Sequence, residues 1–381
     1  MIPVVIIGGG ASGLMLASLL PPKSAIVIES NPKVGAKLLV SGGGRCNVTN
    51  EIVSSDNYLG DKDFISNVLR HFDQNALLSW CEVRGLSLIS QKNHQYFCPN
   101  SAKEIVFILT KESNKQTVLL NEKVLNINHG QDGFLVQTNK QKIKAKFVVV
   151  ASGGLSYPIL GASDIGYKLA QNANHSISKL SPALVGFTLQ KEQFFMKELS
   201  GSSVNNIEIK VGTKICKGDL LFTHKGISGP SVLDASLYWE KGSISIDFLP
   251  NFRWKSISGS KKNISTLLPL PKRVTKSLLE HLDIPDKPFS ALSKADQDKL
   301  NILNNYSLAP AGTFGYSKAE VTRGGVITNE IDPYTMMSNK VDNLYFAGEV
   351  LDVTGELGGY NLQWAFSSAF VCAKALKPKI K

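Results

Sequence analysis

The residues best suited to chemistry near the N-terminus are three glycines in the pattern G-x-G-x-x-G. Gly8, Gly10 and Gly13 stand between a β-branched run and a stretch of helical composition. Glycine in these places permits a tight turn, a close approach of backbone to a pyrophosphate, and close packing of a helix on a sheet. Glu29, at the end of the next apolar run, can accept hydrogen bonds from ribose hydroxyls. The pattern therefore predicts a dinucleotide held on a Rossmann-type fold.

A second glycine-rich region lies near the C-terminus. Residues 343–349 (NLYFAGE) lead into a Gly-acid pair, so Glu349 or Asp352 can bond the hydroxyls of a ribityl or ribose chain. Gly358-Gly359-Tyr360-Asn361 then precede a stretch of helical composition. The positive end of a helix dipole suits the electron-rich pyrimidine end of a reduced flavin. Together the two regions favour FAD over NAD as the resident dinucleotide.

The expected cofactor contacts come from glycine turns, helix starts and the polar side chains beside them. Ala151-Ser152-Gly153, after an apolar run, is a further point where backbone can pass close to the cofactor, and its alternative is an ordinary strand-end turn. We expect contacts from Gly8, Gly10, Ala11, Ser12, Gly13, Glu29, Ser30, Lys37, Leu38, Ser41, Gly42, Gly43, Gly44, Arg45, Asn47, Val124, Ala151, Ser152, Gly153, Gly348, Glu349, Gly359, Tyr360, Asn361 and Leu362.

The segment 34–50 (VGAKLLVSGGGRCNVTN) carries the first candidates for catalysis. Arg45 can pair with a phosphate or with an anionic reduced flavin, and Cys46 can donate a proton to a substrate carbon. A lone cysteine is more often structural, so that alternative stays open. His224, in FTHKGISGP, and Tyr360 complete the set, although a histidine in such a segment is more often packed than catalytic.

The N-terminal region has the sequence pattern of a βαβ unit. Residues 3–7, 11–20 and 25–28 form a β-branched run, a helical stretch that stops at a Pro-Pro pair, and a second apolar run. Later patterns predict strands at 117–120, 134–137 and 143–150, a helix at 164–173, and a C-terminal helix at 362–376.

From about residue 183 the texture changes to separated strand-like runs at 185–189, 207–211, 220–222 and 244–248. Proline-broken helical stretches follow at 274–282 and 293–304, with Ser293 as a cap. We therefore expect an α/β protein in which a discontinuous Rossmann-type FAD-binding domain is interrupted by an antiparallel β-rich insert and a small helical insert. The expected boundaries are 1–183 and 321–381 for the FAD-binding domain, 184–252 and 306–320 for the β-rich insert, and 253–305 for the helical insert.

The 381-residue chain carries a net charge of +11, which favours anionic partners. Residues 253–276 hold seven basic residues and no acid, with Trp254 among them. This segment is a candidate RNA-facing surface, and its alternative is a solvated basic face. The basic residues are Arg253, Lys255, Lys261, Lys262, Lys272, Arg273 and Lys276.

The five cysteines have spacings that fit neither a disulfide framework nor a zinc site, so we expect a cytoplasmic protein without a metal. The apolar stretch at residues 2–20 lacks a basic leader and is interrupted by Pro3 and by glycines. We therefore expect neither a signal peptide nor a membrane span.

Sequence blocks spread along nearly the whole chain resemble bacterial NAD(P)/FAD-dependent oxidoreductases of the BaiN/RdsA type, which are related to glutathione-reductase-like FAD folds. The resemblance implies a discontinuous FAD domain that carries a β-barrel-like insert and a small helical insert. The matching blocks are IIGGGASGLMLA, LLVSGGGRCNVTN, ASGGLSYP, LLFTHKGISGPSVL, TRGGVITNEI and LYFAGEVLDVTGELGGYNLQWAFSSA.

The resemblance also implies flavin-dependent reduction of a carbon-carbon double bond, in a steroid-like enone or in a uracil base of ribosomal RNA. The basic segment makes us favour ribosomal RNA, with dihydrouridine as the product. The alternatives are a small-molecule enone reductase or amine-type oxidase, and a non-catalytic FAD-dependent RNA-binding factor. NADH or NADPH is the expected electron donor, and since no second glycine fingerprint is evident, its placement stays open, as does the oligomeric state.

Overall fold

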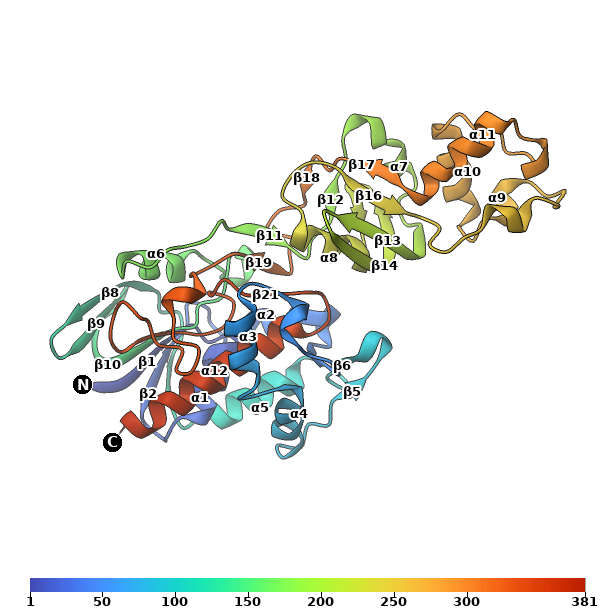
Figure 1. Ribbon diagram of the computed structural model, residues 1–381. Helices are drawn as coiled ribbons and strands as arrows, with labels where there is room; N and C mark the ends of the chain where they lie inside the picture. The colour runs from blue at the N-terminus through green and yellow to red at the C-terminus, as the bar shows by residue number, and fades with distance from the viewer. Residues whose placement is uncertain (381) are drawn as a thin grey trace. The chain divides into compact units, whose positions relative to one another are not determined.

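The computed structural model describes residues 1–380 of the chain, with Lys92 described by its backbone alone. The chain folds into two compact units, Met1–Pro182 with Glu320–Lys381, and Ala183–Ala319. The second unit is therefore one continuous segment inserted into the first (Figure 1). Each unit buries its own hydrophobic cluster.

A seven-stranded sheet is the centre of the first unit. Its strands are β1 (Ile2–Ile7), β2 (Ala25–Ile28), β7 (Thr117–Leu119), β8 (Val124–Gly130), β9 (Gly133–Thr138), β10 (Lys142–Val150) and β20 (Leu344–Phe346). The order is β7-β2-β1-β10-β9-β8, and β20 pairs with the carboxyl end of β10. β7, β2, β1, β10 and β20 pair in parallel, whereas β9 pairs antiparallel with both β10 and β8. The carboxyl ends of the parallel strands form the edge where ligands bind in such sheets.

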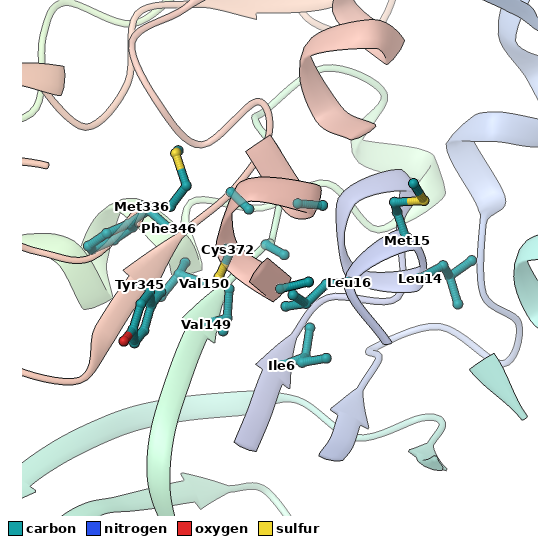
Figure 2. Close-up of a cluster of buried hydrophobic side chains, with 14 of the residues drawn as sticks. Ile6, Leu14, Met15, Leu16, Val149, Val150, Met336, Tyr345, Phe346 and Cys372 are labelled. Carbon is teal, nitrogen blue, oxygen red and sulfur yellow. The ribbon is translucent and has the colours of Figure 1, made fainter. Parts of the chain in front are cut away.

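Continuous apolar runs explain why β1 and β10 occupy the middle of this sheet. Val4 to Ile7 and Phe147 to Val150 are buried throughout, as strands covered on both faces require. The covering helices include α1 (Ala11–Leu19), α5 (Lys103–Ser113) and α12 (Tyr360–Leu376), and α1 packs against both of the others. In Figure 2, side chains of β1, α1, β10 and α12 meet in one apolar cluster.

Shorter elements complete the first unit around this sheet. The helices are α2 (Ala36–Val40), α3 (Lys62–Leu69), α4 (Gln74–Glu82) and α6 (Ile165–Asn172). A small antiparallel sheet has the order β3-β6-β5, from β3 (Asn47–Asn50), β6 (Gln95–Phe97) and β5 (Ile89–Ser90). β4 (Tyr58–Leu59) pairs with β21 (Thr354–Gly355), and β11 (Ser181–Ala183) with β19 (Val321–Arg323).

The second unit is built on an antiparallel sheet with the order β17-β16-β13-β14-β15-β12-β18. Its strands are β12 (Phe187–Thr188), β13 (Ser203–Val211), β14 (Lys214–Thr223), β15 (Gly226–Ser228), β16 (Ile244–Asp247), β17 (Tyr306–Leu308) and β18 (Gly312–Thr313). Among the residues that the structure describes, the end strands β17 and β18 do not pair with each other, so the sheet is open and the barrel-like closure implied by the family resemblance is not formed.

Helices of the second unit share the hydrophobic cluster of its sheet. They are α7 (Phe195–Glu198), α8 (Pro230–Tyr238), α9 (Ile264–Leu267), α10 (Lys272–His281) and α11 (Lys294–Lys299). Val274 and Leu278 of α10 are buried in the same cluster as Ile209 of β13. The helical segment and the sheet are therefore stabilised by one core.

Most expected elements are found with small shifts at their ends. The strand expected at 143–150 is β10, the helix at 164–173 is α6, and the C-terminal helix begins at Tyr360, two residues earlier than expected. Ser293 caps α11 as expected, accepting a hydrogen bond from Asp296 N over 3.1 Å. The strand expected at 185–189 is limited to Phe187–Thr188, because the segment pairs only where β15 and β18 lie beside it.

Candidate active site

The first glycine turn joins β1 to α1 at the carboxyl edge of the parallel sheet. Gly8 has φ +110°, and a Cβ there would lie 2.5 Å from the backbone oxygen of Ala151, so only glycine fits. A Cβ on Gly13 would overlap Gly8 O, which fixes how closely α1 approaches the turn. Gly10 differs, since a Cβ there would meet no atom within 4 Å. Open space therefore lies beside the N-terminus of α1.

The N-terminus of α1 is available to an anion. Gly10 is its N-cap, no side chain caps it, and no acidic residue lies in its first turn. The first N–H groups of a helix have no partner within the helix, and they carry its partial positive charge. A pyrophosphate is the type of group that such a turn binds.

Glu29 lies where a ribose is expected, at the end of β2. The residue is 8% exposed, and its two carboxylate oxygens accept hydrogen bonds from Gly9 N and Asn31 N, each over 2.8 Å. Glu122 N donates to the backbone oxygen of Glu29 over 3.0 Å, which brings the start of β8, with Val124, beside this position. The carboxylate is thus fixed next to the glycine turn.

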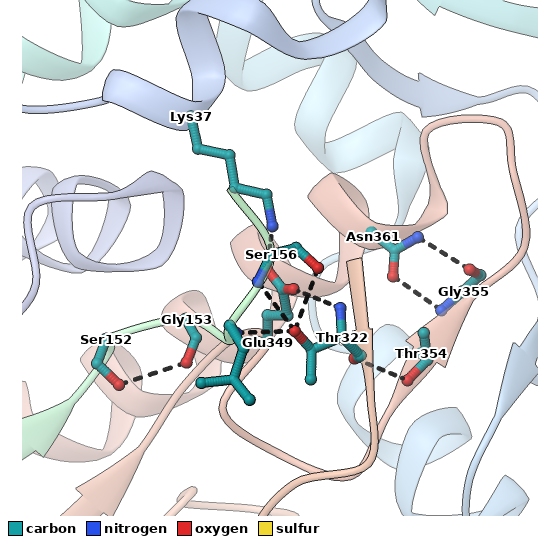
Figure 3. Close-up of polar contacts among 10 residues, drawn as sticks. Lys37, Ser152, Gly153, Ser156, Thr322, Glu349, Thr354, Gly355 and Asn361 are labelled. Atoms are coloured by element: carbon teal, nitrogen blue, oxygen red, sulfur yellow. Dashed lines mark hydrogen bonds and ion pairs between the residues drawn. The ribbon is translucent and has the colours of Figure 1, made fainter. Parts of the chain in front are cut away.

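Glu349 is held by an ion pair with Lys37. Lys37 Nζ lies 2.7 Å from Glu349 Oε2, and Thr322 N donates to Glu349 Oε1 over 2.9 Å. Figure 3 shows the lysine reaching from α2 toward the carboxylate that follows β20. The sequence pattern named both charged residues as cofactor contacts but did not pair them, because they lie far apart along the chain.

Thr322 and Ser156 are site residues that the sequence motifs did not identify. Thr322 is 1% exposed, and its Oγ1 accepts hydrogen bonds from Leu155 N over 2.8 Å and from Ser156 N over 3.2 Å. This hydroxyl fixes the segment after Gly153 against Glu349 (Figure 3). Only the TRGGVITNEI block marks the position in the sequence, and it gives no role for the threonine.

The N-terminus of α12 is the second helix start at the site. Its N-cap, Gly359, has φ +92° and no capping side chain. A Cβ on Gly359 would lie 2.6 Å from Thr49 O and 2.8 Å from Asn47 Oδ1. Asn361 forms hydrogen bonds with both backbone groups of Gly355, over 2.8 and 2.9 Å, and so anchors the preceding turn. The start of α12 is therefore fixed close to β3.

The candidates for catalysis have different surroundings. Arg45 is exposed, lies 5.9 Å from the centre of the Phe97 ring, and contacts the Gln91 amide. Cys46 is fully buried, and a hydrogen bond with Cys98 together with burial raises the pKa of its thiol well above the usual value. The Cys46 thiol is therefore protonated but directed into the core.

The other two candidates lie in different units. Tyr360, the first residue of α12, is 9% exposed and its backbone oxygen accepts a hydrogen bond from Tyr58 over 2.9 Å. His224 is exposed in the turn between β14 and β15 of the second unit. Tyr360 thus lies beside the second glycine turn of the first unit, and His224 belongs to the second unit.

The basic segment 253–276 lies in the second unit with aromatic rings beside it. Trp254 contacts Phe252 edge-on at 5.2 Å and stacks with Phe289 at 6.2 Å, measured between ring centres. All seven of the basic residues are exposed: Arg253, Lys255, Lys261, Lys262, Lys272, Arg273 and Lys276.

The site in the first unit fits FAD. Two uncapped helix N-termini, an open glycine turn and a buried carboxylate at the end of β2 are the features that a flavin dinucleotide requires. The model of the HI0933-like protein Rossmann domain family matches residues 2–375. The chain belongs to this family.

Relatives of this chain have named activities. The chain is 38% identical to a ribosomal RNA dihydrouridine synthase of Escherichia coli, over 98% of this chain and 97% of that protein. It is 31% identical to a 3-dehydro-bile acid delta(4,6)-reductase of Clostridium scindens, over 97% of this chain and 98% of that protein. The HI0933-like chain is therefore a flavoprotein oxidoreductase.

A solved structure shares the fold of this HI0933-like protein at low sequence identity. The 3-ketosteroid delta1-dehydrogenase of Sterolibacterium denitrificans is 12% identical, with a TM-score of 0.51, and the match covers 99% of both chains. No helix within residues 1–380 has the length and apolar character needed to cross a membrane.

Proposed function

We propose that this protein reduces a uracil base of ribosomal RNA to dihydrouridine. The observation that carries the proposal is the full-length similarity to a ribosomal RNA dihydrouridine synthase. The exposed basic segment 253–276 supports it, because phosphate contacts by Lys and Arg supply most of the affinity for nucleic acid. Trp254 lies beside the basic residues, half-buried against Phe252 and Phe289.

The residues of the first unit would hold the cofactor for this reaction. The N-terminus of α1 would bind the pyrophosphate, Glu29 the adenosine ribose and Glu349 the ribityl chain, and the N-terminus of α12 would face the pyrimidine end of the flavin. Bound FAD in its reduced form supplies the hydride that a carbon-carbon double bond accepts. Lys37 and Thr322 orient Glu349 and thereby fix the cofactor.

Arg45 and Cys46, adjacent on the glycine loop, would have different roles in this reaction. Arg45 is exposed on the glycine loop, where its guanidinium can stabilise negative charge that develops on a carbonyl conjugated with the double bond. The buried Cys46 stabilises the glycine loop, because its thiol forms a hydrogen bond with the thiol of Cys98. We assign the catalytic contact to Arg45 and a structural role to Cys46.

NADH or NADPH is the proposed electron donor. The only G-x-G-x-x-G turn identified in the chain is the one assigned to FAD, so the donor would dock transiently at the flavin rather than occupy a second Rossmann turn. A ribosomal RNA substrate, together with five buried free cysteines, favours the cytoplasm as the location.

A deletion strain tests the proposal directly. Ribosomal RNA from the strain should lack one dihydrouridine that mass spectrometry detects in the parent, and the wild-type gene should restore it. A gene carrying Gly13→Val, which cannot form the first glycine turn, should not restore it. An unchanged set of dihydrouridines in all three strains would rule the proposal out.

The second candidate is reduction of a small enone, which the similarity to the bile-acid reductase favours. An anaerobic experiment separates the two functions. Flavin reduced with NADH or NADPH is mixed either with protein-free ribosomal RNA or with a steroid enone, and its reoxidation is followed by absorbance. Reoxidation by RNA with formation of dihydrouridine supports the first function, and reoxidation by the enone alone supports the second.

A further inference from the structure

Three amide side chains surround the glycine pair that precedes α12. Asn47 and Asn50 belong to β3 and Gln95 to β6, and no sequence motif singled out Asn50 or Gln95. A Cβ on Gly358 would lie 3.3 Å from Asn50 Nδ2 and 3.5 Å from Gln95 Nε2. Polar side chains therefore lie beside the backbone that we propose faces the pyrimidine end of the flavin.

The orientation of the Asn47 amide follows from its backbone neighbours. As placed, Asn47 Nδ2 donates to Gln95 Oε1 over 2.8 Å. With the amide swapped, Asn47 Oδ1 accepts from Gly359 N over 3.1 Å and Asn47 Nδ2 donates to Thr49 O over 3.2 Å. Amide oxygen and nitrogen are distinguished only by such partners, and backbone groups cannot change their roles. The swapped orientation is therefore the satisfied one.

This orientation determines which atom Gln95 presents. Asn47 Oδ1 now faces the Gln95 amide at 2.8 Å, and two oxygens cannot share a hydrogen bond, so Gln95 must turn its Nε2 toward Asn47. Its Oε1 then points away from Asn47 as a hydrogen-bond acceptor. Among the side chains that the structure describes, none forms a hydrogen bond with this end of the half-buried Gln95 amide.

We infer that Gln95 recognises the N3–H group of the uracil base, an inference that rests on the proposed function. Uracil carries a donor at N3 between two carbonyl acceptors, whereas cytosine carries an acceptor at N3. Gln95 Oε1, whose direction is set by the hydrogen bond between Gln95 Nε2 and Asn47, can accept a hydrogen bond from N3–H of uracil. Toward cytosine the same oxygen would face the lone pair of N3. Gln95 is thus a specificity residue, and Asn47 is the positioning residue that sets its orientation.

The test compares uridine with N3-methyluridine. The substrate is a single-stranded oligonucleotide around the uridine that the deletion strain identifies, so that the methyl group breaks no base pair. For the wild-type holoenzyme, kcat/KM should fall roughly tenfold or more on methylation, as expected when a polar group of the site loses its partner. Binding of both oligonucleotides to the oxidised holoenzyme, measured by fluorescence anisotropy at high salt, should show the same preference.

Gln95→Leu removes the acceptor and should bring the ratio of the two kcat/KM values close to one. Gln74→Leu is the matched control, because Gln74 is a half-buried glutamine of the same unit whose Nε2 bonds Glu51 O, away from the glycine pair. The control should retain the wild-type preference. The flavin absorbance spectrum checks that each variant still holds FAD.

The outcomes separate this inference from the proposed function. Equal rates for both oligonucleotides with the wild-type enzyme, or a preference that survives in Gln95→Leu, would overturn the role of Gln95 while dihydrouridine formation stands. Failure of the wild-type enzyme to reduce any uridine of ribosomal RNA would overturn the proposed function, and the role of Gln95 with it.

Discussion

Replacing Thr322 by valine tests whether one buried hydroxyl organises the site. Valine has nearly the same shape, so packing is retained while the acceptor for Leu155 N and Ser156 N is lost. Each buried donor without a partner costs about 1–3 kcal/mol. Ser156 Oγ also lies 3.3 Å from the Thr322 hydroxyl and can relieve part of the loss. We therefore expect a destabilisation of about 2–4 kcal/mol.

Differential scanning calorimetry measures this effect. For domains of 150–250 residues, 1 kcal/mol lowers Tm by roughly 2–4 °C, so Thr322→Val should lower it by roughly 5–15 °C. The affected transition is the one that added FAD raises, since a ligand stabilises the unit that binds it. Thr322→Ser keeps the hydroxyl but loses the γ-methyl group, so it reports the packing contribution that Thr322→Val retains. A Tm for Thr322→Val within about 2 °C of the wild-type value, the smallest shift that 1 kcal/mol produces, would refute the reasoning.

Three further predictions concern charge. Lys37→Met should weaken FAD binding by about 3–30-fold, measured by flavin fluorescence, because Glu349 loses the partner that orients it; an unchanged Kd would contradict that role. Burial alone would raise the pKa of the Glu330 carboxyl. Hydrogen bonds from Lys340 and Ser176, together with the charge of Lys340, outweigh burial and lower this pKa from 4.5 to about 2. Its contribution, about 2 kcal/mol after allowance for solvent screening, is therefore present above pH 4.5 and lost as the pH falls toward 2; Glu330→Gln should lack this dependence in acid-unfolding curves. Replacing four exposed residues of the basic segment by glutamine should weaken RNA binding and reduce the slope of log K against log salt by roughly 3, whereas an unchanged slope would argue for a solvated face. These four are Lys261, Lys262, Lys272 and Arg273.

The sequence predicted the parts of the fold in which local pattern and tertiary role coincide. A buried parallel strand needs an apolar run on both faces, so β1 and β10 could be recognised directly. The turn between β1 and α1 could likewise be recognised, because Gly8 and Gly13 lie where a Cβ would meet backbone atoms. Short strands such as β12 could not be bounded, because their ends depend on the partners beside them.

The cofactor and the family could also be predicted from the sequence, because each motif places several cofactor-binding residues within a short segment. Two glycine-rich regions predicted FAD, and the matching blocks predicted the oxidoreductase family that the comparisons confirm. The motifs do not by themselves give the surroundings of a side chain. Arg45 and Cys46 are adjacent in the sequence, yet one is exposed and the other is buried.

Only the tertiary structure decided which distant residues act together. Lys37 and Glu349, Thr322 and Ser156, and Asn47 and Gln95 lie in contact although long stretches of chain separate the first two pairs. Their contacts depend on distance and hydrogen-bond direction, which residue types and spacing do not encode. The sequence by itself thus determined the cofactor class and the elements that bind it, whereas the folded chain determined how each carboxylate and amide is oriented, because that is fixed by partners from other strands.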